Sequence, residues 1–273
     1  MRTVPKLCLS LLAAATFAST GVCSAAAVDA RPPDRLTFMG SGVRLPDSDD
    51  NGGGASLNYL HYFTPDLVVG LGAEHQTIVD SQWTFGSVRG SWSRGEPASR
   101  FSLFGEMNYG SGDENGRNFD YSVGVLGISQ SFTSKFFVLL ESRQIDIDTS
   151  HGNLPKLSLT YVWTPRLQTS VGYANSVSGN LGTELTSARI DYYGRYVTLI
   201  VGGATGTAAS SVVNLQPGLT LPSQDTNEGF AGIGKTFKRG EVLLLGDYLE
   251  FGGTPKWTLL LSFTAYLGSR GSQ

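Results

Sequence analysis

Thiols and charged side chains are scarce in this chain of 273 residues. Both of its cysteines, Cys8 and Cys23, lie within the first 27 residues, and only 16% of all residues are charged. The chain beyond residue 27 therefore forms neither a disulfide nor a thiolate metal site. The formal net charge of −3 gives no electrostatic reason to expect a nucleic acid as a partner.

Long hydrophobic runs are also missing. Past the N-terminal segment, no stretch approaches the roughly 18 apolar residues that a membrane-spanning helix needs, which excludes a bundle of such helices. Glycine is abundant instead, with 35 residues. Leu, Val, Ile and Phe remain plentiful, so a disordered chain is excluded as well. These features favour a β-rich protein, and a barrel embedded in a membrane is one such protein.

The first 27 residues have the features of a secretory signal peptide. Arg2 and Lys6 give a positive start, an apolar run follows at 7–17, and 24–27 offers small residues to a signal peptidase. We expect cleavage near Ala26 or Ala27 and export across the inner membrane. Lipid attachment at Cys23 is disfavoured, because Val22 precedes it where a small residue is required.

The rest of the chain alternates between apolar and polar residues with the period of two that is typical of strands. In 257–267 the apolar positions are Trp257, Leu259, Leu261, Phe263 and Leu267. Similar alternation occurs in 156–163 and 100–109. No segment beyond residue 27 shows a helical period over more than a few residues. The pattern predicts strands with one apolar face and one small, polar face.

Two kinds of connection separate the predicted strands. Six short turns are expected at 63–66, 94–100, 132–135, 163–166, 193–195 and 237–240, most of them just after an aromatic residue. Longer polar segments lie between them at 47–54, 110–118, 146–153, 176–182 and 205–228. Pro, Gly and Asn give both kinds the chemistry of turns and loops.

Short and long connections that alternate predict an all-β fold, a closed antiparallel transmembrane β-barrel of about 14 strands (12–16) over residues 28–267. A sheet that faces lipid must close, because an open edge would leave backbone groups unsatisfied. The expected location is the cell outer membrane, with short periplasmic turns. The expected partners are outer-membrane lipid, lipopolysaccharide and the barrel-assembly machinery. A soluble periplasmic β-sandwich is the alternative fold.

The sequence resembles the bacterial outer-membrane β-barrel proteins over essentially the whole segment 28–267. The hairpin at 161–173 looks like those of the YaiO-type barrels, and that resemblance implies a link to exopolysaccharide handling. One departure is the polar tail at 268–273. Barrels of this class usually end on an aromatic residue that the assembly machinery recognises, whereas here Leu267 and the tail follow Phe263 and Tyr266.

Two motifs suggest ligands but lack the structural context those ligands need. The segment 229–236 matches the phosphate-loop pattern, yet no buried strand precedes it and no helix follows, so no nucleotide is expected. The segment 47–52 resembles the first half of a calcium loop. Asn58 stands where the closing glutamate would be, and no metal ligand is assigned.

The positions of the three histidines bear on whether the protein is an outer-leaflet lipid hydrolase. His61 falls near a periplasmic turn, His75 at the outer end of its strand beside Glu74, and His151 in a loop after Ser150. A hydrolase would need one of them next to a serine nucleophile. No Gly-x-Ser-x-Gly elbow occurs in the chain. No catalytic residue and no cofactor are therefore assigned.

Charged residues that alternate with the apolar face are expected to point into the lumen. They would cost about 2 to 4 kcal/mol on the lipid face at mid-bilayer, in the case of Arg or Lys. The set is Glu74, Arg89, Glu106, Glu141, Arg143, Arg189, Asp191, Lys235 and Asp247. Their mixed signs fit either a water-filled channel or a lumen closed by ion pairs.

The sequence thus predicts a non-enzymatic outer-membrane barrel that acts as a passive pore or as an accessory or surface barrel of the envelope. Two alternatives remain open. One is the lipid hydrolase, and the other is a structural or adhesin-like barrel that binds through its outer loops, chiefly 205–228.

Overall fold

The computed structural model describes residues 32–46, 50–78, 81–96, 98–114, 116–147, 150–209 and 223–268. The predicted signal peptide, most of the polar tail and part of the predicted calcium motif lie outside these residues. The strands are β1 (Asp34–Leu45), β2 (Asp50–Tyr62), β3 (Leu67–Ile78), β4 (Ser81–Arg94), β5 (Phe101–Glu114), β6 (Arg117–Ser131), β7 (Phe136–Ile147), β8 (Ser150–Thr164), β9 (Leu167–Asn175), β10 (Ser178–Gly179), β11 (Glu184–Tyr193), β12 (Thr198–Ala208), β13 (Gln224–Phe237), β14 (Gly240–Phe251) and β15 (Thr254–Leu267).

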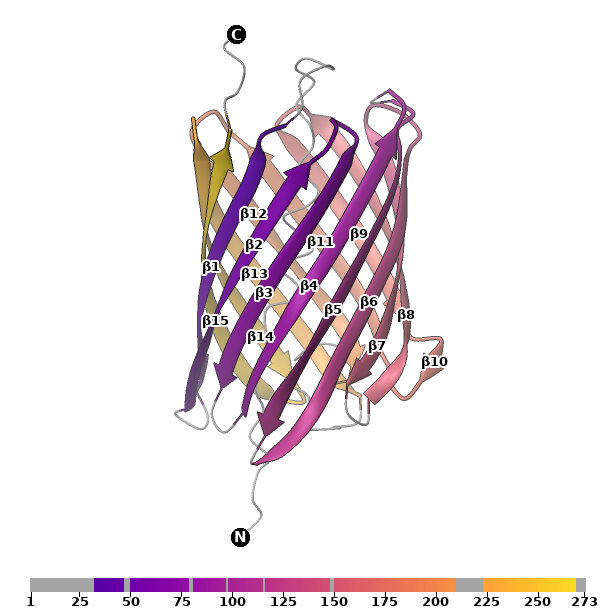
Figure 1. The fold of residues 1–273 in the computed structure, drawn as a ribbon. Helices are drawn as coiled ribbons and strands as arrows, with labels where there is room; N and C mark the ends of the chain where they lie inside the picture. The colour runs from indigo at the N-terminus through magenta and orange to yellow at the C-terminus, as the bar shows by residue number, and fades with distance from the viewer. Residues whose placement is uncertain are drawn as a thin grey trace.

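Fourteen of these strands form one closed antiparallel barrel, as the sequence predicts. Each pairs with its neighbour in the chain, and β15 returns to pair with β1 from Asp34↔Leu267 to Arg44↔Trp257. Figure 1 shows the tilted strands, with yellow β15 beside indigo β1. The short β10 pairs only with β8, at Gly152 and Asn153 near the start of that strand. Closure gives every strand two partners, so no sheet edge is left open.

The six predicted short turns all occur at one end of the barrel, which we call the turn end. The described chain also enters and leaves the barrel at this end, at Asp34 and Leu267. The opposite end, called the loop end, carries β10 and lies lowest in Figure 1. Among the described residues, no helix is long and apolar enough to span a membrane.

The outer face is apolar over most of its height. On β15, Trp257, Leu259, Leu261 and Phe263 are all more than half exposed, while Thr258 and Leu260 between them are buried on the inner face, as is Lys256 just before them. Aromatic side chains gather at the turn end, where Phe63, Phe132, Trp163, Tyr196 and Phe237 are exposed. An apolar band with an aromatic girdle is the outer surface of a membrane barrel.

The polarity of the two faces inverts towards the loop end. On β6, outward Leu126 and Ile128 are exposed in the apolar band, but outward Asp120, nearer the loop end, is polar. Inward Phe119 and Tyr121 beside it are buried. We call this part the collar, after its cluster of inward apolar residues: Val43, Leu45, Ile78, Trp83, Phe85, Phe119, Tyr121, Val123, Val125, Ile145, Ile147, Leu154, Ala174, Leu181 and Ala209.

The collar corrects the expected long loops at 110–118 and 146–153. Strands β5 and β6 remain paired up to Glu114↔Arg117, and β7 and β8 up to Ile147↔Ser150. The polar residues that suggested loops are the outward half of an alternating strand. The strands are 12 to 15 residues long at these positions, whereas about 9 to 11 suffice to cross a bilayer. The surplus length builds the collar.

Candidate functional site

The inner face carries a belt of charged side chains at mid-height, between the collar and the turn end. The structure places eight of the nine residues expected there on the inward-facing positions of their strands: Glu74, Arg89, Glu106, Glu141, Arg143, Arg189, Asp191 and Asp247. Their registers bring them side by side, as Arg89 lies opposite Glu106 across β4 and β5. The belt is therefore a shared feature of several strands.

Lys235 does not belong to the belt, and the expectation that it faces the lumen is wrong. On β13 it shares the exposed face with Ile233 and Phe237. Its Nζ lies 5.4 Å from the centre of the Phe237 ring. The position is close to the turn end, where a lysine can keep its stem in apolar surroundings and its ammonium in water. The segment 229–236 that resembled a phosphate loop is part of strand β13.

Two belt pairs are joined along a single strand. Arg143 Nη2 lies 3.0 Å from Glu141 Oε1 on β7, and Arg189 Nη2 lies 2.6 Å from Asp191 Oδ1 on β11. Gln168 on β9 donates from Nε2 to Asp191 Oδ2 at 3.0 Å. In both pairs, residues two apart on one face of a strand meet directly, because the long Arg side chain spans that spacing.

Three further charged residues belong to the belt and were not among the predicted set. Lys156 on β8 lies opposite Glu141 in the register. Glu228 on β13 and Lys256 on β15 both lie opposite Leu249 of β14, two positions from Asp247 on the same face. Lys156 and Glu228 attract each other electrostatically although β9, β11 and β12 separate their strands. The belt therefore reaches across the lumen as well as around it.

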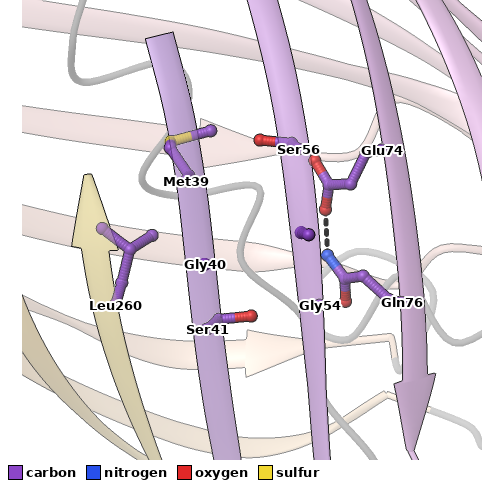
Figure 2. Close-up of a pocket in the computed structure, with 9 residues that line it drawn as sticks. Met39, Gly40, Ser41, Gly54, Ser56, Glu74, Gln76 and Leu260 are labelled. Carbon is purple, nitrogen blue, oxygen red and sulfur yellow. Dashed lines mark hydrogen bonds between the residues drawn. The ribbon is translucent and has the colours of Figure 1, made fainter. Parts of the chain in front are cut away.

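A small hollow lies in the belt wall, on the turn-end side of the collar. It has a volume of about 20 Å³, room for roughly one water. Figure 2 shows Glu74 and Gln76 joined by a hydrogen bond at its edge, with Ser56 beside them. Met39 and Leu260 close the apolar side of the hollow.

The histidines do not form a hydrolytic site within the described residues. His75 Nδ1 is 2.7 Å from Thr84 Oγ1 on the outer face, while Glu74 points to the inner face. The backbone N–H of His151 donates to Asn180. His61 contacts Asp34 at 2.9 Å, close to the turn end. In the part of the chain that is described, no group of three or more His, Cys, Asp or Glu residues is placed to hold a metal ion.

Comparisons with known proteins identify the fold. No family model and no curated protein sequence matches the chain, so the likeness to YaiO-type barrels has no support from sequence. Solved structures do match. The CymD monoaromatic hydrocarbon channel has a TM-score of 0.59 at 11% identity, with 88% of this chain and 90% of that chain covered.

Two other solved structures are also similar. The outer membrane protein Omp33 of Acinetobacter baumannii gives a TM-score of 0.53 at 10% identity, covering 87% of this chain and 99% of its own. A bacterial polysaccharide outer membrane secretin gives 0.51 at 9% identity, covering 88% and 100%. The fold is that of the bacterial outer-membrane β-barrels. Within that class, CymD is named as a monoaromatic hydrocarbon channel and TodX of Pseudomonas putida as a toluene transporter.

Proposed function

We propose that the protein is a passive channel of the outer membrane, with its turn end in the periplasm. The observation that carries this proposal is the charged belt. It crosses mid-height of a barrel whose outer face is apolar, so water or ion pairs must compensate the charges inside. A lumen that admits water does this at little cost, because wet charges are screened. The structural likeness to channel proteins supports the same function.

The composition of the belt suggests only weak ion selectivity. Its carboxylates are Glu74, Glu106, Glu141, Asp191, Glu228 and Asp247, and its cations are Arg89, Arg143, Lys156, Arg189 and Lys256. The two sets nearly balance. Mixed signs at close spacing leave little net potential for a permeating ion.

Conductance of the refolded full-length protein in planar bilayers tests the proposal. The expected result is discrete channels with a reversal potential near zero in a KCl gradient. In the double variant Arg143→Glu, Arg189→Glu, the belt loses two positive charges and gains two negative ones, and the reversal potential should shift towards cation selectivity.

Arg94→Glu is the matched control, because Arg94 lies at the end of β4 on the exposed face. It should shift the reversal potential much less. Refolded protein that shows no conductance, with the double variant merely unfolding at a lower temperature, would mean that the belt closes the lumen and that the channel proposal is wrong.

A link to polysaccharide export stays a prediction of the sequence resemblance. The TM-score of 0.51 with the polysaccharide secretin indicates a similar fold. Binding through the connection between β12 and β13 also stays a prediction, since most of that connection lies outside the described residues.

A further inference from the structure

An aromatic wall lines one side of the collar. Two aromatic residues of β4 and two of β6 face the lumen on either side of β5, whose inward positions between them are glycines. The register places Trp83 opposite Gly112 opposite Phe119, and Phe85 opposite Gly110 opposite Tyr121. We call Trp83, Phe85, Phe119 and Tyr121 the aromatic wall.

Because Gly110 and Gly112 of β5 have no side chains, the aromatic side chains of β4 and β6 can pack over that strand. A Cβ on Gly112 would collide with the Phe119 ring, and a Cβ on Gly110 would collide with Phe85. The rings of Phe85 and Tyr121 stack with centroids 5.3 Å apart and an interplanar angle of 24°. The four rings therefore pack over the inner side of a strand without side chains, and all four residues are buried.

Two hydrogen-bond donors in this wall have no acceptor. Trp83 Nε1 and Tyr121 Oη are buried without a hydrogen-bond partner in the structure, and the two residues are only 2% and 1% exposed. Leaving a buried donor unsatisfied costs about 1 to 3 kcal/mol. Such groups are rare in folded proteins, so a pair of them on one wall calls for an explanation.

We propose that the aromatic wall binds a small neutral aromatic solute that carries a hydrogen-bond acceptor, such as an aromatic ester, aldehyde or ketone. The inference deepens the proposed channel function and rests on it, since it names a solute class for the lumen. Ring stacking against the wall contributes affinity. The indole N–H of Trp83 and the hydroxyl of Tyr121 supply the donors that an acceptor oxygen would satisfy.

Charged residues of both signs lie near the wall. Glu74, Glu106 and Arg143 all act electrostatically on Tyr121, so the two carboxylates outnumber the one cation and disfavour an anionic solute. Glu74 also lies opposite Phe85 in the register, and Gln76 lies opposite Trp83. Glu74 and Gln76 also line the hollow of Figure 2, which holds about one water. Because the wall residues are buried, a ring enters only when side chains of the wall shift.

The indole N–H signals of the refolded full-length protein test the proposal by NMR. The chain has four tryptophans, and Trp83→Phe assigns the signal of Trp83. Titration with methyl benzoate should shift that signal downfield in a saturable manner. Ethylbenzene has a similar shape and lacks an acceptor, so it should produce no comparable downfield shift.

Tyr121→Phe removes one donor and should weaken methyl benzoate binding roughly three- to tenfold, the effect of one neutral hydrogen bond. Tyr109→Phe is the matched control, because Tyr109 lies on the outer face and is 63% exposed. It should leave the affinity unchanged. Unboiled gel mobility verifies that each variant is folded. If Tyr121→Phe does not fold, the shift of the Trp83 indole N–H signal in the unsubstituted protein alone tests the binding site.

The absence of a saturable shift, or equal weakening by both tyrosine variants, would overturn the binding site. If the protein conducts ions but shows no such shift, the solute proposal fails and the channel proposal stands. If the shift occurs without conductance, the site stands and the channel proposal fails.

Discussion

Arg189 and Asp191 form an ion pair along β11, with the carboxylate held from a second side by Gln168 of β9. The side chains of Arg189 and Asp191 are 9% and 2% exposed. A pair this deeply buried is expensive to break, because removing one partner leaves the other charge desolvated. The loss of stability when this pair is broken therefore measures how far water is excluded from the belt.

Asp191→Asn should lower the free energy of unfolding by roughly 3 to 5 kcal/mol if the pair is dry. Urea unfolding in detergent, followed by tryptophan fluorescence, measures this. Asp66→Asn is the control, since it breaks the exposed pair of Arg100 and Asp66 at 2.9 Å and should cost less than about 1 kcal/mol. Equal small effects would show that water reaches Asp191 freely.

The apolar band is tested by adding a charge at two heights of the outer face. Leu261→Arg places a cation in the band and should destabilise the barrel in lipid vesicles by about 2 to 4 kcal/mol. Asp146→Arg places the same side chain on the exposed outer face of the collar, where water is expected, and should have little effect. A comparable loss from both variants would mean that the membrane extends over the collar.

The orientation of the barrel is tested by epitope insertion in two tight turns. A tag between Gly252 and Gly253 lies at the loop end, in a turn where both glycines have positive φ. It should bind antibody on intact cells. A tag between Lys238 and Arg239 lies at the turn end and should bind only after permeabilisation. The reverse pattern would invert the proposed orientation.

The close approach of β4 to β5 is tested at Gly110. A Cβ there would collide with the Thr84 carbonyl oxygen and with Phe85. Gly110→Ala should lower the free energy of unfolding by about 1 to 3 kcal/mol, the usual cost of overpacking. At Gly246 a Cβ meets nothing within 4 Å, so Gly246→Ala should change it by less than about 0.5 kcal/mol.

The barrel and its six short turns were predictable because alternation and turn chemistry are local properties of the sequence. The collar was not. A stretch such as 110–118, with Ser, Asp, Asn and Gly, has the composition of a loop, and only pairing across strands shows that its glycines face inward and its polar residues face water. The turn at 252–253 was not predicted because two residues are too few to stand out in the sequence.

The belt was predicted in most of its members, and the errors have physical causes. Lys256 precedes the outward residue Trp257, so the alternation of β15 by itself predicts that Lys256 faces inward. Glu228 was overlooked because it was assigned to a loop. Lys235 was misplaced because a charged residue was assumed to avoid the outer face, although a lysine near the girdle reaches water along its own stem.

In the collar, the exposed residues and the residues that pack against one another lie on opposite faces of the same strands. Its outward positions, such as Asp120 and Asp146, are exposed, whereas the apolar packing lies on the opposite side of the same strands. With the turn end in the periplasm, as proposed above, antibodies and bacteriophages that approach the cell would contact the outward set. Substitutions there leave the inner packing intact, so this rim is where the surface can change its antigenic character at the least structural cost.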